Sequence, residues 1–313
     1  MRPIGDFKQH ARHLHLKHLM VLHTLICKRD LYTGAASLGT VVEALGEGLR
    51  LHLHDDGSLQ PEDWDYLLGQ LPGSVKWARA ATQEQVLEKL SRYPACLRYR
   101  PTTAMGVKVF DLPLLCQGPV LSYMDSDIVF FKRVERLFHP DSESAVYLRS
   151  DEEGFCAPIP ELHWKWKIPF VISLNAGLFQ LPMALYDLDK IEWFLREVYE
   201  RKGVWRTRDN AEQTVWAMLA AQRPAYHFSR RQIHCSRFKK LEITDELVAV
   251  HCIYHLKPWV EKLVAKAKLS LAKSNKPVAL AWERARHLNS LDVVVRRIQR
   301  ACRKMVSPEF PKE

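Results

Sequence analysis

Apolar runs alternate with amphipathic segments along the first 130 residues of the chain. The alternation indicates an α/β fold with a mixed, mostly parallel sheet flanked by helices. In open sheets of this class, ligands bind beyond the carboxyl ends of the strands, so polar residues that follow an apolar run are the first candidates for a site. Strands are predicted at residues 16–26, 49–54, 75–78 and 120–124, and helices at residues 32–45, 61–68, 83–90 and 106–115.

Two aspartates, Asp125 and Asp127, flank Ser126 directly after the apolar run 120–124, and the apolar pattern resumes at residues 128–131. Because side chains alternate along an extended backbone, both carboxylates project to the same side. Carboxylate oxygens suit Mg²⁺ or Mn²⁺, and such an ion neutralises a diphosphate. Taken alone, two acids at a surface turn are also typical of a solvated strand end.

A second polar segment follows an apolar run at residues 247–250. It contains His251, Tyr254, Lys257, Pro258 and Trp259, and it resembles the HxxGxxKPW signature of the retaining glycosyltransferases that include glycogenin and the bacterial lipopolysaccharide galactosyltransferases. Tyr254 stands where that signature has glycine. The resemblance implies that His251 completes the metal site of Asp125 and Asp127 and that Lys257 contacts the donor diphosphate. His255 is an alternative metal ligand.

Further short segments resemble the same family in the same order. The resemblance implies that Asn175 and Gly177 contact the donor sugar, and that Glu212 and Gln213 lie beneath the sugar ring, with Glu212 in place of the usual Asp. It also implies that Lys108 is the basic residue ahead of the acidic strand and that Tyr32 packs against uracil. The alternatives are a turn for Asn175 and Gly177, the first turn of a helix for Glu212 and Gln213, a solvated charge for Lys108 and ordinary packing for Tyr32.

The resemblance covers residues 30–259 and implies the GT-A nucleotide-diphospho-sugar transferase fold. We expect a catalytic domain at residues 1–256, an extension at residues 257–313, and metal-dependent transfer of a hexose from a UDP-sugar to a glycan or lipid-linked acceptor. Retention at the anomeric carbon is implied by the resemblance only.

Other classes of protein remain as alternatives. The string from Asp55 to Ser58 (Asp-Asp-Gly-Ser) is also typical of inverting transferases. A nucleotidyltransferase requires a glycine-rich phosphate loop after the first strand, and residues 27–30 contain no glycine.

Composition is ordinary for a globular protein, with 47% hydrophobic and 26% charged residues among 313. No stretch approaches the roughly 18 consecutive apolar residues of a membrane-spanning helix. The seven cysteines show no paired spacing, which favours a reducing, cytoplasmic location. The histidines 10, 13, 15, 18 and 23 lack partner cysteines or acids at ligand spacing, so no site is assigned to them.

The positive charge is concentrated at one end of the chain. Residues 257–313 hold 14 Lys and Arg against 5 Asp and Glu, which accounts for nine of the ten net positive charges. Helices are predicted at residues 259–272 and 278–305. A basic amphipathic tail is consistent with packing on the core, with peripheral contact to an anionic membrane, or with a non-enzymatic nucleic-acid-binding protein. We favour packing with some membrane contact and expect no nucleic-acid partner. A long loop is expected at residues 156–166, with aromatic side chains that line an acceptor site.

Overall fold

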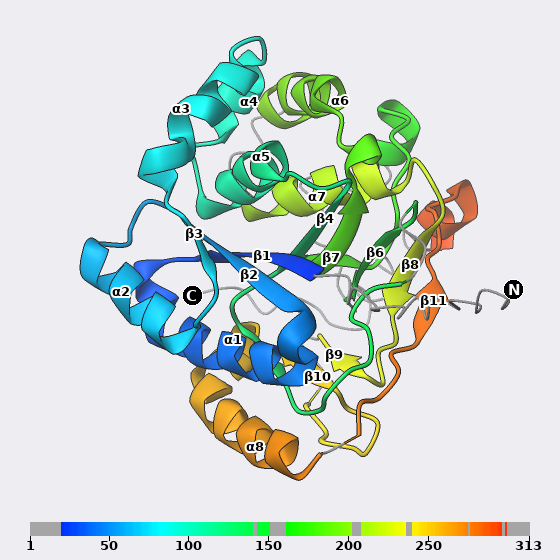
Figure 1. Cartoon of the computed structure of the whole chain (residues 1–313). Helices are drawn as coiled ribbons and strands as arrows, with labels where there is room; N and C mark the ends of the chain where they lie inside the picture. The colour runs from blue at the N-terminus through cyan, green and yellow to red at the C-terminus, as the bar shows by residue number, and fades with distance from the viewer. Residues whose placement is uncertain are drawn as a thin grey trace, which may run out of the picture.

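The computed structural model describes residues 20–139, 143–150, 161–201, 208–235, 240–274, 276–295 and 298. Its centre is an eight-stranded sheet with the order β11-β8-β6-β7-β4-β1-β2-β3. Helices cover both faces of the sheet, with α3 to α7 on one side and α1 and α2 on the other (Figure 1). The molecule is therefore a three-layer α/β structure, as the alternating pattern predicts.

The first half of the sheet is parallel. β1 pairs with β2 from Met20 opposite Leu49 to Ile26 opposite Asp55, and it also pairs with β4. β1 is almost wholly buried because helices cover both faces of a parallel sheet. The elements of this half are β1 (Met20–Ile26), α1 (Leu31–Leu45), β2 (Leu49–Asp55), α2 (Pro61–Gln70), β3 (Val75–Trp77), α3 (Arg79–Leu90), α4 (Pro94–Tyr99), α5 (Ala104–Leu115) and β4 (Val120–Met124).

The second half of the sheet is mixed. β7 lies between β4 and β6 and is antiparallel to both, β8 is parallel to β6, and β11 is antiparallel to β8. The elements of this half are β6 (Ala145–Arg149), the π-helical turn η3 (Glu161–Lys165), β7 (Leu174–Pro182), α6 (Leu188–Trp193), the π-helical segment η5 (Phe194–Glu200), α7 (Arg208–Ala220), β8 (Ala225–Phe228) and β11 (Trp282–Arg284).

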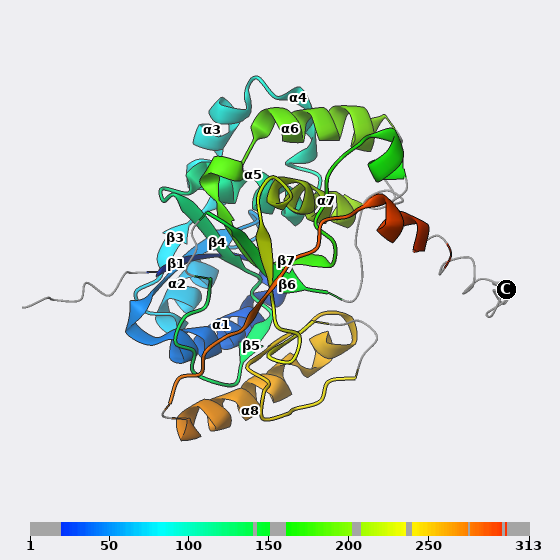
Figure 2. The same ribbon diagram turned by 90° about the vertical axis from the view of Figure 1, so that its right-hand side faces the viewer.

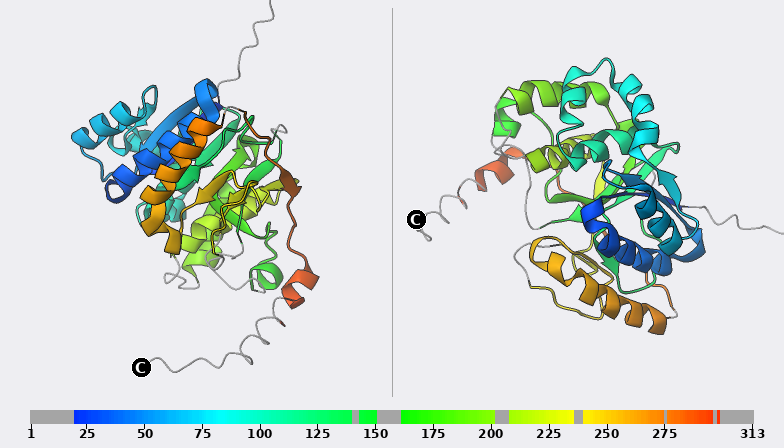
Figure 3. Two further views of the ribbon diagram at one scale, coloured as in Figure 1. Left: turned by 90° about the horizontal axis from the view of Figure 1, so that it is seen from below. Right: turned by 90° about the vertical axis from the view of Figure 1, so that its left-hand side faces the viewer.

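A second, three-stranded sheet lies beside the carboxyl end of β4. In it β10 (Ala249–His251) is antiparallel to β5 (Ile128–Phe130) and parallel to β9 (Ile233–His234). The 3₁₀ segment η7 (Tyr254–Trp259) and helix α8 (Val260–Lys273) follow β10. α8 lies alongside α1 (Figure 3) and buries an apolar face that includes Val260, Leu263 and Val264.

The structure confirms the α/β architecture and the predicted strand at 120–124, and it corrects the C-terminal region. The helix expected at residues 278–305 is wrong over residues 278–289, where Trp282–Arg284 adds an edge strand to the main sheet. Residues 290–295 are helical, and residues 299–305 lie outside the described part. The loop expected at residues 156–166 contains the turn η3. Residues 156–160 and histidines 10, 13, 15 and 18 also lie outside the described residues. The division of the chain at residue 256 stays a prediction.

Among the described residues, no helix combines the length and the apolar character needed to traverse a lipid bilayer.

Candidate metal and donor site

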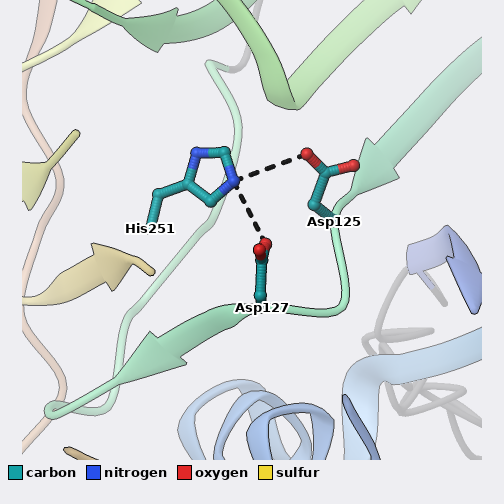
Figure 4. A group of neighbouring side chains, drawn as sticks. All are labelled: Asp125, Asp127 and His251. Carbon is teal, nitrogen blue, oxygen red and sulfur yellow. Dashed lines mark ion pairs between the residues drawn. The ribbon is translucent and has the colours of Figure 1, made fainter. Parts of the chain in front are cut away.

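Asp125, Asp127 and His251 converge at the carboxyl end of β4 (Figure 4). β4 ends at Met124, the chain turns through Asp125 and Asp127, and β5 begins at Ile128. The antiparallel register of β5 and β10 sets His251 opposite Ile128. His251 Nε2 therefore lies 3.4 Å from Asp125 Oδ2 and 3.1 Å from Asp127 Oδ1. The pairing of β5 with β10 joins residues that are 119 to 123 positions apart in the sequence.

We refer to Asp125, Asp127 and His251 as the metal group. The ligand atoms of these residues fit a divalent cation. One ligand atom from each of the three residues lies within 4.8 Å of the others. Asp127 Oδ1 is buried and faces His251 Nε2 at 3.1 Å, and a buried carboxylate oxygen needs such a partner or a cation to compensate its charge. Two carboxylates and an imidazole suit Mn²⁺ or Mg²⁺. The exposed His255, the alternative ligand, is not part of the group.

Gly177 gives His251 the space to reach this position. A Cβ atom built on Gly177 would lie 2.2 Å from Cε1 and 2.7 Å from Nδ1 of His251, closer than real Cβ contacts. The Gly177 carbonyl accepts a hydrogen bond from the Asp125 backbone N–H at 2.6 Å, and Asn175 Oδ1 accepts one from the Gly177 N–H at 2.8 Å. The segment from Asn175 to Gly177 thus supports the metal group from β7.

Lys108 is buried beneath the metal group. Its Nζ, from α5, lies 3.1 Å from Asp125 Oδ1 and 3.2 Å from Glu212 Oε1, and 4.5 Å from the centre of the Tyr123 ring. Burial lowers the pKa of Lys108, but Asp125 and Glu212 outweigh that effect and raise the pKa above its ordinary value. The Lys108 ammonium ion therefore links the metal carboxylate to Glu212, so it is not a solvated charge.

Glu212 lies near the start of α7 and is buried. Its Oε1 accepts a hydrogen bond from Trp216 Nε1 at 2.6 Å, in addition to the ion pair with Lys108. Burial raises the pKa of Glu212, and the Lys108 ammonium ion offsets that effect only in part. Gln213 follows on the same helix and is half-buried.

Asp125 and His251 shift each other's pKa in opposite directions. Burial raises the pKa of Asp125, but the Lys108 ammonium ion and a hydrogen bond from His251 outweigh burial and hold the pKa below its usual range. Burial lowers the pKa of His251, while the two aspartates raise it well above the ordinary value. Asp125 and Asp127 thus place two carboxylates beside one imidazole, and a pair of carboxylates attracts a cation.

The remaining predicted residues lie at the rim of the sheet. Lys257 Nζ is 3.3 Å from Asp30 Oδ2, and both side chains are partly exposed. Tyr32 is 65% exposed, and its ring contacts that of Tyr66 edge-to-face with the centroids 5.0 Å apart. Asp55 accepts hydrogen bonds from the backbone N–H groups of Arg79 and Gly57, which is a turn-stabilising role.

Three neighbours of the site escaped sequence reasoning: Tyr123, Trp216 and Cys235. The Tyr123 hydroxyl donates to Asp125 Oδ1 at 2.5 Å, and the Cys235 sulfur lies 3.6 Å from His251 Nδ1. Tyr123 is two residues before Asp125 on one strand face, and Trp216 is four residues after Glu212 on one helix face. These spacings are signals for both contacts. Cys235 has no such signal, because it directly follows β9 and comes near His251 only through the β9–β10 pairing.

Comparison with known proteins finds matches in three-dimensional structure but none in sequence. No family model matches the sequence, and no curated protein matches it. An active-site mutant of LgtC superposes with a TM-score of 0.52 at 13% identity, covering 80% of this chain and 96% of LgtC. The bifunctional glycosyltransferase WbbM in its apo form gives a TM-score of 0.52 at 11% identity, covering 88% of this chain and 51% of WbbM. With its central mixed sheet and flanking helices, the chain has the GT-A fold of glycosyltransferases.

Proposed function

We propose that the protein is a metal-dependent glycosyltransferase. It would move a hexose from a nucleoside diphosphate sugar, most simply a UDP-sugar, to a glycan or lipid-linked acceptor, with retention at the anomeric carbon. The observation that carries the proposal is the convergence of Asp125, Asp127 and His251 at the carboxyl end of β4 in a GT-A fold.

The donor diphosphate is assigned to the rim formed by β1, β4 and η7. A cation held by Asp125, Asp127 and His251 supplies Lewis-acid stabilisation of charge on the diphosphate oxygens. Lys257 exchanges its ion pair with Asp30 for one with the diphosphate, because a phosphate carries more charge than a single carboxylate. The exposed ring of Tyr32 at the start of α1 is available to stack on the nucleobase.

The sugar is assigned to the region around Glu212. Trp216 Nε1 donates to Oε1 of Glu212, and Lys108 pairs with the same oxygen, so both contacts hold the carboxylate through one of its two oxygens. We assign Glu212, Gln213 and Asn175 to positioning the sugar. Retention rests on the sequence resemblance of these segments.

The rival classes make different predictions. In an inverting transferase Asp55 and Asp56 would serve the reaction, but Asp55 is occupied by the backbone of Arg79 and Gly57. A nucleic-acid-binding protein would use the basic tail and leave Asp127 without a function.

The test is thermal unfolding of the purified chain with nucleoside diphosphates, with and without Mn²⁺. A ligand that binds only the folded state raises the unfolding temperature by mass action. We expect a shift that needs both Mn²⁺ and one nucleoside diphosphate. Asp127→Asn should abolish the shift, whereas Asp65→Asn, an exposed acid on α2, should leave it intact. Equal shifts for Asp127→Asn and the parent chain would contradict the proposal.

A further inference from the structure

A pocket separate from the metal group is lined by residues 166–169, which follow η3, and by helices α6 and α7. Its volume is about 300 Å³. Figure 2 shows η3 beside the α6–η5 helix and close to α7. Ile168 and Met218 are buried in its lining, and the rings of Trp166 and Trp193 meet edge-to-face with centroids 6.4 Å apart.

The pocket is distinct from the donor site. Met218 and Glu212 both belong to α7, and six residues separate them by roughly 9 Å along a helix axis. None of the lining residues is part of the Asp125–His251 group or of the Lys108–Glu212 ion pair. A ligand in this pocket is therefore not the donor diphosphate.

The lining defines the chemistry of a ligand. Most of the surface is carbon, and among the described residues of the lining the charged ones are Lys167 and Lys190, both basic. Lys190 Nζ lies 4.0 Å from Asp187 Oδ2. Trp166 Nε1 is buried and has no hydrogen-bond partner among the described residues. Such a lining suits a ligand with an apolar part and an anionic group. Its described side chains include no oxygen that could accept a hydrogen bond from a sugar hydroxyl.

The backbone at the mouth is held in an unusual conformation. Lys167 has a φ of 50°, a left-handed conformation that side chains other than Gly, Asn and Asp seldom adopt. Conformations of this kind persist where the surrounding structure enforces them, and they gather at ligand sites. Here Ile168 donates its N–H to the Leu162 carbonyl at 3.2 Å, and Trp166 donates its N–H to the Glu161 carbonyl at 3.3 Å, so hydrogen bonds hold the chain on either side of Lys167.

We propose that this pocket binds the alkyl chain of a long-chain alkyl phosphate, with the phosphate paired to Lys167 and Lys190. The alkyl chain is buried against Ile168, Met218, Trp166 and Trp193, and the ammonium groups of the two lining lysines neutralise the phosphate. This binding does not depend on the glycosyltransferase reaction proposed above.

The probe is dodecyl phosphate below its critical micelle concentration, titrated calorimetrically into the full chain. We expect one molecule bound per chain and at least tenfold weaker binding of dodecyl maltoside, which carries the same alkyl chain on a neutral head. Lys167→Glu and Lys190→Glu should each weaken dodecyl phosphate binding at least tenfold. Lys76→Glu is the matched control, because the Lys76 ammonium lies over the Trp64 ring at 4.9 Å, outside the pocket.

Two further variants test the apolar part. Met218→Phe fills the pocket and should abolish binding. Because Met218 is buried and a larger side chain there can disturb the fold, Pro169→Glu, at an exposed position of the same lining, is the second variant. Equal affinity for the neutral amphiphile, several molecules bound per chain, or unchanged affinity in the two lysine variants would overturn the proposal. Nucleotide-dependent thermal shifts should be unchanged in all four pocket variants, which separates this test from that of the donor site.

Discussion

At the residue scale, Asp125 divides its two oxygens between different partners. Oδ1 accepts the Tyr123 hydroxyl and pairs with Lys108, while Oδ2 faces His251. Groups that hold a metal ligand from behind fix its orientation and tune its basicity. Glu212 is held in a comparable way, because Lys108 and Trp216 both occupy Oε1. One buried lysine therefore orients a proposed metal ligand and a proposed sugar-binding carboxylate at the same time.

Trp216→Phe should lower kcat for sugar transfer on the order of 10- to 100-fold while KM for the donor stays nearly constant. The substitution removes the N–H that holds Glu212, and a hydrogen bond to a charged group contributes about 1.5–3 kcal/mol. Steady-state kinetics with Mn²⁺ measure the effect. Trp77→Phe is the control, because Trp77 donates its indole N–H to His52 at 3.1 Å, outside the site. An unchanged kcat in Trp216→Phe would contradict the positioning role.

Gly177→Ala should weaken Mn²⁺ binding at least tenfold, because the new Cβ would displace the His251 ring. Calorimetric titration of Mn²⁺ into the chain measures the affinity. Gly39→Ala is the matched control: a Cβ there meets no atom within 4 Å, and alanine in a helix is about 1 kcal/mol more favourable than glycine. That variant should bind Mn²⁺ normally and unfold at a higher temperature. Equal Mn²⁺ affinity in both variants would argue against the histidine ligand.

At the element scale, the pairing of β1 with β2 buries imidazoles inside the sheet layer. His23 Nδ1 lies 2.9 Å from His54 Nε2, and both side chains are buried. Burial and the neighbouring His52 lower the pKa of His23 to about 3, and burial also holds the pKa of His54 well below its usual value. These histidines are neutral in the folded chain and take up protons on unfolding.

The unfolding temperature should therefore fall as the pH drops below about 6.5. Between that pH and about 3, the unfolded chain binds protons at these histidines that the folded chain does not. Each such histidine therefore lowers the free energy of unfolding by up to about 1.4 kcal/mol for each pH unit. Above pH 6.5 these histidines are neutral in both the folded and the unfolded chain, so they no longer lower the free energy of unfolding. Calorimetry at pH 7.5, 6.5 and 5.5 measures the slope, which His23→Gln combined with His54→Gln should flatten. The exposed His287→Gln should not change it, and an unfolding temperature independent of pH in the parent chain would contradict the assignment.

At the scale of the whole molecule, the positive charge is concentrated in one part of the sequence. Nine of the ten net positive charges belong to residues 257–313, while the metal group is acidic. The last described helical residues expose apolar side chains, among them Leu291 at 71% and Ile298 at 56%. We propose that residues 257–313 contact an anionic membrane surface, where each basic residue contributes about 1 kcal/mol.

Charge reversal of Arg296, Arg300 and Arg303 to Glu should reduce binding to vesicles that contain anionic phospholipid at least tenfold. Binding of the parent chain should weaken as salt is raised from 0.05 to about 0.5 M, because screening shortens the range of the attraction. Co-sedimentation measures both effects, and neutral vesicles are the control. Retained binding after charge reversal, or preferential binding of duplex DNA, would exclude a membrane role for the tail.

The sequence by itself determined the alternation of strands and helices, the aspartate pair after β4 and the His251–Trp259 segment, because these depend on local periodicity and on residue types at short spacing. Only the tertiary structure decided what meets across the sheet. The β5–β10 register brings His251 to Asp127, Gly177 makes room for it, and Lys108 joins Asp125 to Glu212 from separate helices and strands. Residues 282–284 illustrate the same limit. Their spacing of apolar residues predicts a helix, but they form a strand, because the edge of β8 offers backbone groups that need hydrogen-bond partners. Contacts of this kind depend on chain segments far apart in the sequence, and no local pattern records them.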